Sequence, residues 1–224
     1  MPYMLGAVLI ICALIAYNKR KSDRAARKNT ESFWDREREA NMARRKDISL
    51  LPYIRIPYDT LPLAALPESD EYTAAVQQLR ALSDKQILDL SGQTNTDLKL
   101  AYGAANLPVL MECDQNYLIL IRLLSRMATL LCEAGQDIAA ETVLCFAIDI
   151  GSSIRSVYLQ LAALYAKRKD YPKLDALIAK ANASEFPAKD RLLASLNEIK
   201  EQAVGTHNPD FNIDMLFHDS INGG

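Results

Sequence analysis

The side chains that most often do chemistry in proteins are scarce in this sequence and poorly placed for it. Only two histidines occur among the 224 residues, His207 and His218, and both follow Gly205, where the last helical period ends. A general base must be held rigidly within hydrogen-bond reach of its target. The sequence also lacks the glycine-rich phosphate-binding motifs, the zinc-protease motif H-E-x-x-H and the nucleophile motif G-x-S-x-G. We therefore expect no catalytic residue.

Four cysteines are the other candidates for reactivity or metal binding. Cys12 lies in an apolar N-terminal run, whereas Cys113, Cys132 and Cys145 are far apart, without C-x-x-C or paired Cys/His spacing. In a reducing compartment such residues behave as small hydrophobic side chains. We expect buried thiols, with a disulfide or a zinc site as the alternatives, and neither a metal nor a cofactor.

The chain is organised around a helical hairpin pattern between residues 117 and 186 that occurs twice at a spacing of 34 residues. Large residues match large ones in the two copies, and Ala128/Ala162 and Ala147/Ala181 are small in both, whereas Ala140 is replaced by Leu174. Antiparallel helices approach closely at small residues, and bulky neighbours fill the space beside them. The matched pairs are Leu124 and Tyr158, Met127 and Leu161, Ala128 and Ala162, Leu131 and Tyr165, Ala140 and Leu174, Leu144 and Ile178, and Ala147 and Ala181.

This pattern resembles the tetratricopeptide repeat, which has the same period and the consensus W-x2-L-G-x2-Y…A-x3-F…P. The resemblance implies an all-α fold and a ligand groove lined by the first helix of each hairpin. Within that groove, Arg122 and Arg126 share a face and would bind an acidic partner segment or pair with acidic residues of the chain itself. The groove positions implied are Arg122, Ser125, Arg126 and Thr129 in the first copy, and Ser156, Leu159, Gln160 and Ala163 in the second.

Residues 1–18 predict a transmembrane anchor. Residues 2–17 carry no charge, and as a helix they would span about 24 Å, slightly less than a hydrocarbon core. Basic residues follow this run and none precedes it, so the positive-inside rule places the N-terminus outside and the remaining chain in the cytoplasm. A cleaved signal peptide and a buried core helix are the alternatives. The residues expected at the membrane surface are Lys19, Arg20, Lys21, Arg24, Arg27 and Lys28.

The net charge of −2 conceals an uneven distribution. Residues 19–28 hold six of the 26 basic and one of the 28 acidic residues, so the rest of the chain has 20 basic and 27 acidic residues and is net −7. A basic block beside a membrane span contacts anionic lipid. An acidic body argues against nucleic-acid binding, which needs clustered Lys and Arg on one face.

Two segments of different composition lie between the predicted anchor and the repeats. Residues 19–47 predict a charged juxtamembrane stalk, either helical or a solvated spacer. Residues 48–67, here called the strap, contain prolines at intervals of five, which exclude a helix and favour an extended backbone. Because the strap is rich in apolar residues, we expect Ile54 and Ile56 to pack against the helices.

The remaining boundaries follow from capping signals. Residues 68–116 predict a helical part that includes a short helix from Ser83 to Leu90, and Asp114 is a candidate N-cap for the first repeat helix. Residues 117–203 predict the hairpins and an amphipathic capping helix. Residues 204–224 lack periodicity and predict a mobile tail.

The function that fits these features is a membrane-tethered, cytoplasmic adaptor that binds one or more protein partners. The chain also resembles uncharacterised membrane-anchored repeat proteins of Gram-positive bacteria at residues 51–54 (LPYI) and 97–99 (DLK), a resemblance that implies no activity. A constitutive structural subunit of a membrane complex is the alternative, and an enzyme comes third.

Overall fold

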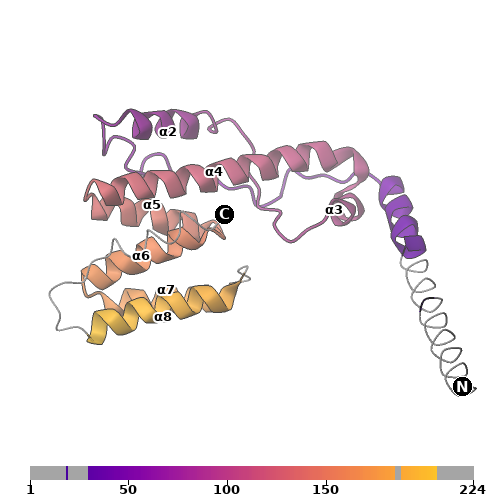
Figure 1. Ribbon diagram of the computed structural model, residues 1–224. Helices are drawn as coiled ribbons and strands as arrows, with labels where there is room; N and C mark the ends of the chain where they lie inside the picture. The colour runs from indigo at the N-terminus through magenta and orange to yellow at the C-terminus, as the bar shows by residue number, and fades with distance from the viewer. Residues whose placement is uncertain (1–18, 20–29, 185–187, 206–224) are drawn as a thin grey trace, which may run out of the picture. The chain divides into compact units, whose positions relative to one another are not determined.

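The computed structural model describes residue 19, residues 30–184 and residues 188–205, and all regular structure in these ranges is helical, without a strand (Figure 1). Two compact units can be distinguished. Of the described residues, one unit contains those up to 51 together with 90–111, and the other contains 52–89 together with those from 112 to 205. The all-α fold class predicted from the sequence is therefore confirmed for the described residues.

The second unit is a stack of helices that is compatible with a helical repeat. In Figure 1, α6 lies between the α4–α5 pair and the α7–α8 pair, and α2 lies beside α4. Residues 112–133 of α4 belong to this unit. Its helices are α2 (Asp70–Arg80), α4 (Leu107–Glu133), α5 (Asp137–Asp149), α6 (Arg155–Lys167), α7 (Tyr171–Ala183) and α8 (Lys189–Gly205).

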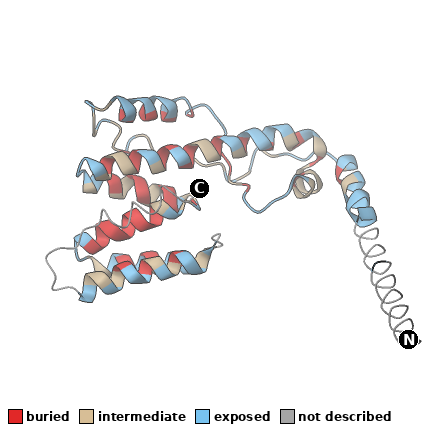
Figure 2. Cartoon of the chain, viewed as in Figure 1, coloured by how far each residue is buried: buried red, intermediate tan, exposed pale blue. Residues whose placement is uncertain are grey.

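The positions of the 34-residue pattern form the core of this unit. Ala128, Ala147, Ala162 and Ala181 are all fully buried, so neighbouring helices approach closely at these small side chains. Every large residue of the pattern is buried as well, except Ile178, which is partly buried. Figure 2 shows buried residues along nearly all of α6.

Local signals set several of the helix ends. Asp170 caps α7 by accepting a hydrogen bond from the Lys173 backbone N–H at 3.3 Å, and Pro172 occupies the first turn, where no N–H is needed. Gly135 and Gly151 have φ values of 69° and 87° and follow α4 and α5. Only glycine adopts this left-handed conformation without strain.

One predicted helix start and one predicted helix are wrong. The first repeat helix, α4, begins at Leu107 rather than after Asp114, because Pro108 is tolerated in a first turn. The helix predicted from Ser83 to Leu90 is absent. Its backbone is used instead for long-range pairing, since the Ile54 N–H donates to the Ile87 carbonyl at 2.8 Å.

The strap packs against the second unit over residues 52–67. Leu61 is buried in the core, and Ile54 and Ile56 are partly buried against it, which confirms the predicted packing. Side-chain hydrogen bonds fix the strap further: the Tyr58 hydroxyl donates to the Leu79 carbonyl at 2.9 Å, and the Tyr72 hydroxyl donates to the Pro62 carbonyl at 2.7 Å.

The first unit contains a helix over residues 30–42, α3 (Asn95–Tyr102) and the 3-10 helix η1 (Ala104–Asn106). Lys99 bridges the first two elements by pairing with Glu37 and donating to Asn41 at 2.8 Å. The buried Asn106 amide donates to the carbonyls of Lys46 and Tyr102, both at 2.7 Å. Much of the predicted stalk is therefore part of a folded unit rather than a spacer.

The membrane prediction falls mostly outside the described residues. Residues 2–17 are not among the described residues. Of the six basic residues predicted at the membrane surface, only Lys19 is described, and it is helical and exposed. The other five are Arg20, Lys21, Arg24, Arg27 and Lys28. Across the ranges that are described, no helix combines the length and hydropathy needed to cross a membrane.

An ion-pair cluster links α5 to the second hairpin and gives a pH prediction. Burial acts to raise the pKa of Glu141, but hydrogen bonds from Lys173, at 2.8 Å, and from Arg168 outweigh it, so the pKa lies below its ordinary value of 4.5. A carboxylate whose pKa is lower in the folded state stabilises the fold above its unfolded pKa and loses this effect as pH falls.

We therefore expect Glu141→Gln to lower the melting temperature at pH 7, with the difference from wild type shrinking as the pH falls below about 4. Thermal unfolding followed by circular dichroism across this range tests it. Glu201→Gln, on the exposed surface of α8, serves as the control. A pH-independent difference at Glu141 would contradict the ion-pair explanation.

Candidate partner-binding groove

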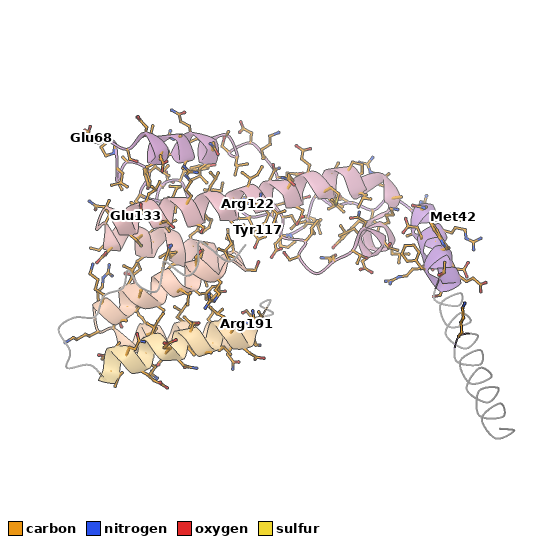
Figure 3. The ribbon with its side chains drawn as sticks, in the orientation of Figure 1. Met42, Glu68, Tyr117, Arg122, Glu133 and Arg191 are labelled. Atoms are coloured by element: carbon orange, nitrogen blue, oxygen red, sulfur yellow. The ribbon has the colours of Figure 1, made fainter. Side chains whose placement is uncertain are left out.

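An open groove of about 840 Å³ lies between α2 and α4 of the second unit. One wall is the exposed side of α2, and the other is a stripe of α4 around Arg122 (Figure 3). The residue before α6, Ile154, completes the lining. The lining residues are Asp70, Glu71, Ala74, Ala75, Gln78, Ile119, Arg122, Leu123, Ser125, Arg126 and Ile154.

The α2 wall is held in place from its opposite face. Ser69 caps the helix by accepting from the Tyr72 N–H at 3.2 Å. The Tyr72 side chain is almost completely buried, and burial raises the pKa of its hydroxyl to about 12. With its hydroxyl bound to the strap, Tyr72 anchors one face of α2 and leaves the other face to line the groove.

The α4 wall carries the positive charge of the groove. Arg126 pairs with Glu71 across the groove at 3.3 Å, but both side chains are more than half exposed, at 58% and 63%. Such a pair contributes only about 0–1 kcal/mol, so an acidic ligand can compete for the guanidinium. Arg122 is exposed and has no ion pair among the residues that the structure describes.

The floor of the groove is apolar. Ala75 and Leu123 are buried there, while Ile119 and Ile154 are partly exposed. A floor of this kind favours apolar side chains of a ligand, at roughly 25 cal/mol per Å² of apolar surface removed from water. The groove thus combines an apolar base with guanidinium groups at its edge.

The predicted groove residues divide into two groups. Arg122, Ser125 and Arg126 line the groove between α2 and α4, and Thr129 and Ser156 are partly buried. Their part in binding a partner stays a prediction. Leu159, Gln160 and Ala163 are buried, so their assignment to an accessible groove is corrected. The reason is that α6 is the central helix of the unit, packed against α5, α7 and α8.

The buried part of the predicted groove is a polar contact between α4 and α6. Gln160 donates its Nε2–H to the Thr129 hydroxyl at 2.8 Å, and that hydroxyl donates to the Ser125 carbonyl at 3.0 Å. The hydroxyls of Ser125 and Ser156 are 3.5 Å apart. Thr129, Ser156 and Gln160 therefore take part in the contact between α4 and α6, and Ser125 borders both this contact and the groove.

Sequence reasoning missed the α2 wall. This wall consists of Asp70, Glu71, Ala74, Ala75 and Gln78, which lie outside the repeat pattern. The available signal was the amphipathic pattern of α2, since a helix that buries Tyr72, Val76 and Leu79 on one side must present another side to a neighbour or to solvent.

A second cavity of about 570 Å³ lies between the strap and α5. Its carboxylates are already engaged, Glu141 with Arg168 and Lys173, and Asp149 with Lys180 at 2.5 Å. It offers no uncommitted charge comparable to Arg122 and is the weaker candidate for binding a partner.

The described cysteines are free thiols with little nucleophilic character. Cys113 is buried, and Cys132 and Cys145 are partly buried. Burial raises the pKa of the Cys132 thiol to about 11, which keeps it protonated at neutral pH. Within the described ranges, no group of three or more His, Cys, Asp or Glu side chains is placed to hold a metal ion.

No protein-family model, curated protein or solved structure matches the chain. Its function must therefore be inferred from the groove and from the sequence.

Proposed function

We propose that this chain is a membrane-tethered adaptor that binds a protein partner in the groove between α2 and α4. The hairpins of the second unit act as a tetratricopeptide-like scaffold, and the groove is the recognition surface. Residues 1–18 anchor the chain, and the helical body lies in the cytoplasm.

The observation that supports this proposal most strongly is the position of Arg122. It is an exposed guanidinium without an ion pair in the described part of the chain, beside an apolar floor. A guanidinium binds a carboxylate through two parallel hydrogen bonds, and the floor adds apolar contact. A segment that alternates carboxylates with apolar side chains fits both features.

The membrane tether is supported by the uncharged residues 2–17 and the basic residues after them. Tethering confines the groove to the membrane surface, so a partner at that surface meets it at a raised effective concentration without any additional contact. An adaptor of modest affinity can therefore work there.

The test is site-specific photo-crosslinking in cells that make the full-length protein. Gln78 lines the groove, whereas its neighbour Gln77 is also exposed on α2 but lies outside it. We expect benzoylphenylalanine at position 78, and not at position 77, to form adducts with a partner protein in the membrane fraction. Equal adducts at both positions, or none at position 78, would reject the groove as the binding surface.

A further inference from the structure

Residues 210–219 of this chain combine carboxylates with large apolar side chains, the two features that fit the groove. They carry three carboxylates, Asp210, Asp214 and Asp219, and residues 206–224 contain no Lys or Arg. Between the carboxylates lie five large apolar residues: Phe211, Ile213, Met215, Leu216 and Phe217. This segment lies outside the described residues, and its sequence was assigned above only to a tail.

We propose that residues 210–219 are an intramolecular ligand of the groove between α2 and α4. The inference rests on the proposed function of the groove and deepens it, because it names the chemistry of the ligand: alternating Asp and large apolar side chains. A partner must then displace this segment, so the chain regulates its own binding site.

Charge complementarity favours this occupant. Without residues 19–28 and without residues 206–224, the chain has 20 basic and 24 acidic residues and is net −4. The body is therefore mildly acidic, and the stripe with Arg122 and Arg126 is locally basic. On the opposite wall, Glu71 is engaged by Arg126, and Asp70 is the acidic group that opposes binding. The aspartates of the segment therefore lie along α4 rather than along α2.

Apolar burial supplies the other part of the driving force. Fully burying a side chain such as Phe or Leu is worth roughly 1.5–3 kcal/mol relative to leaving it in water. The floor formed by Ala75, Ile119, Leu123 and Ile154 accepts such side chains. Arginine at the edge and an apolar floor together match both kinds of residue in the segment.

The segment is long enough to reach the groove of its own chain. It follows α8, which ends at Gly205 and packs against α6. From α8 to α4 the distance across the stack is two helix layers, about 20 Å. If extended, residues 206–213 would span about 26 Å, which is enough to bring residues 214–219 to α4, with two of the three aspartates and three of the five large apolar residues. A short tether of this kind gives an effective concentration on the order of millimolar, which sustains even a weak contact.

The experiment uses purified full-length protein in detergent, with benzoylphenylalanine at position 78 and, as the matched control, at position 77. We expect irradiation to join position 78 to a peptide from residues 206–224 within a single chain, with a yield independent of protein concentration. Replacing the three aspartates by asparagine should lower this yield several-fold, as should Arg122→Glu. Introducing Asp214→Arg into the Arg122→Glu variant should restore it.

Three outcomes would overturn the inference: no crosslink to residues 206–224, equal crosslinking from position 77, or a crosslink that joins two chains and rises with concentration. The last would show that a second copy supplies the ligand. Failure here is distinguishable from failure of the proposed function, because adducts with other proteins at position 78 in cells would persist without the intramolecular crosslink.

Discussion

The variant Leu61→Asp is expected to destabilise the second unit by about 3 kcal/mol or more. Leu61 is buried in the main core cluster, so aspartate there loses the apolar contact and places a carboxylate where it has no partner. Unpaired buried charge is among the few single changes with effects of this size. Circular dichroism of the full-length protein in detergent during heating should show the loss directly.

Leu50→Asp makes the same substitution outside the core and provides the control. Leu50 is 93% exposed, and its replacement should change the free energy of unfolding by no more than about 0.5 kcal/mol. If the two variants melt alike, the strap does not contribute to the core and is a free linker. Prompt proteolysis of the wild-type chain between residues 50 and 66 would support that contrary result.

Replacing Ala181 by leucine is expected to cost roughly 1–3 kcal/mol, because the larger side chain overpacks a close helix contact. Ala181 is fully buried on α7, and two residues earlier on the same helix Ala179 is exposed. Ala179→Leu should be nearly neutral. Ala128→Leu and Ala162→Leu should match Ala181→Leu, because all three alanines occupy small positions of the pattern.

Ala163→Leu is expected to join the destabilising group. The repeat register places this residue on an accessible groove, but the structure buries it at 4% exposure. Equal melting temperatures for Ala181→Leu and Ala179→Leu would contradict the repeat packing, whereas a neutral Ala163→Leu would contradict only the burial of α6.

The repeat helices could be predicted from the sequence because their determinants are local and periodic. Ala128 and Ala162 share a register position, and Asp170 with Pro172 marks a helix start by capping chemistry alone. The packing of Ile54 could also be predicted, because prolines exclude a helix there and the strap is too apolar to remain in water.

The sequence-based predictions are wrong where contacts between residues far apart in the chain determine the local structure. The residues from Ser83 to Leu90 carry a capping signal, yet the Ile87 carbonyl and the Leu88 N–H bond to Ile54 and Cys113. The groove between α2 and α4 could not be predicted for a similar reason: one of its walls comes from α2, which lies outside the repeat pattern. Gln160 is buried because α5, α7 and α8 all pack against α6, and the sequence of α6 alone does not indicate this.

The comparison that tests the central proposal most directly is the effect of Arg122→Glu on stability and on partner capture, measured in the same protein. Because Arg122 is exposed and has no ion pair among the described residues, the free energy of unfolding should change by no more than about 0.5 kcal/mol. The photo-crosslinked adduct at position 78 should disappear.

Arg191→Glu reverses a charge on the exposed surface of α8 and should leave both quantities unchanged. The result that supports partner binding in the groove is loss of the adduct in the Arg122→Glu variant at unchanged melting temperature, with wild-type adduct in the Arg191→Glu variant. An undiminished adduct in the Arg122→Glu variant would contradict it.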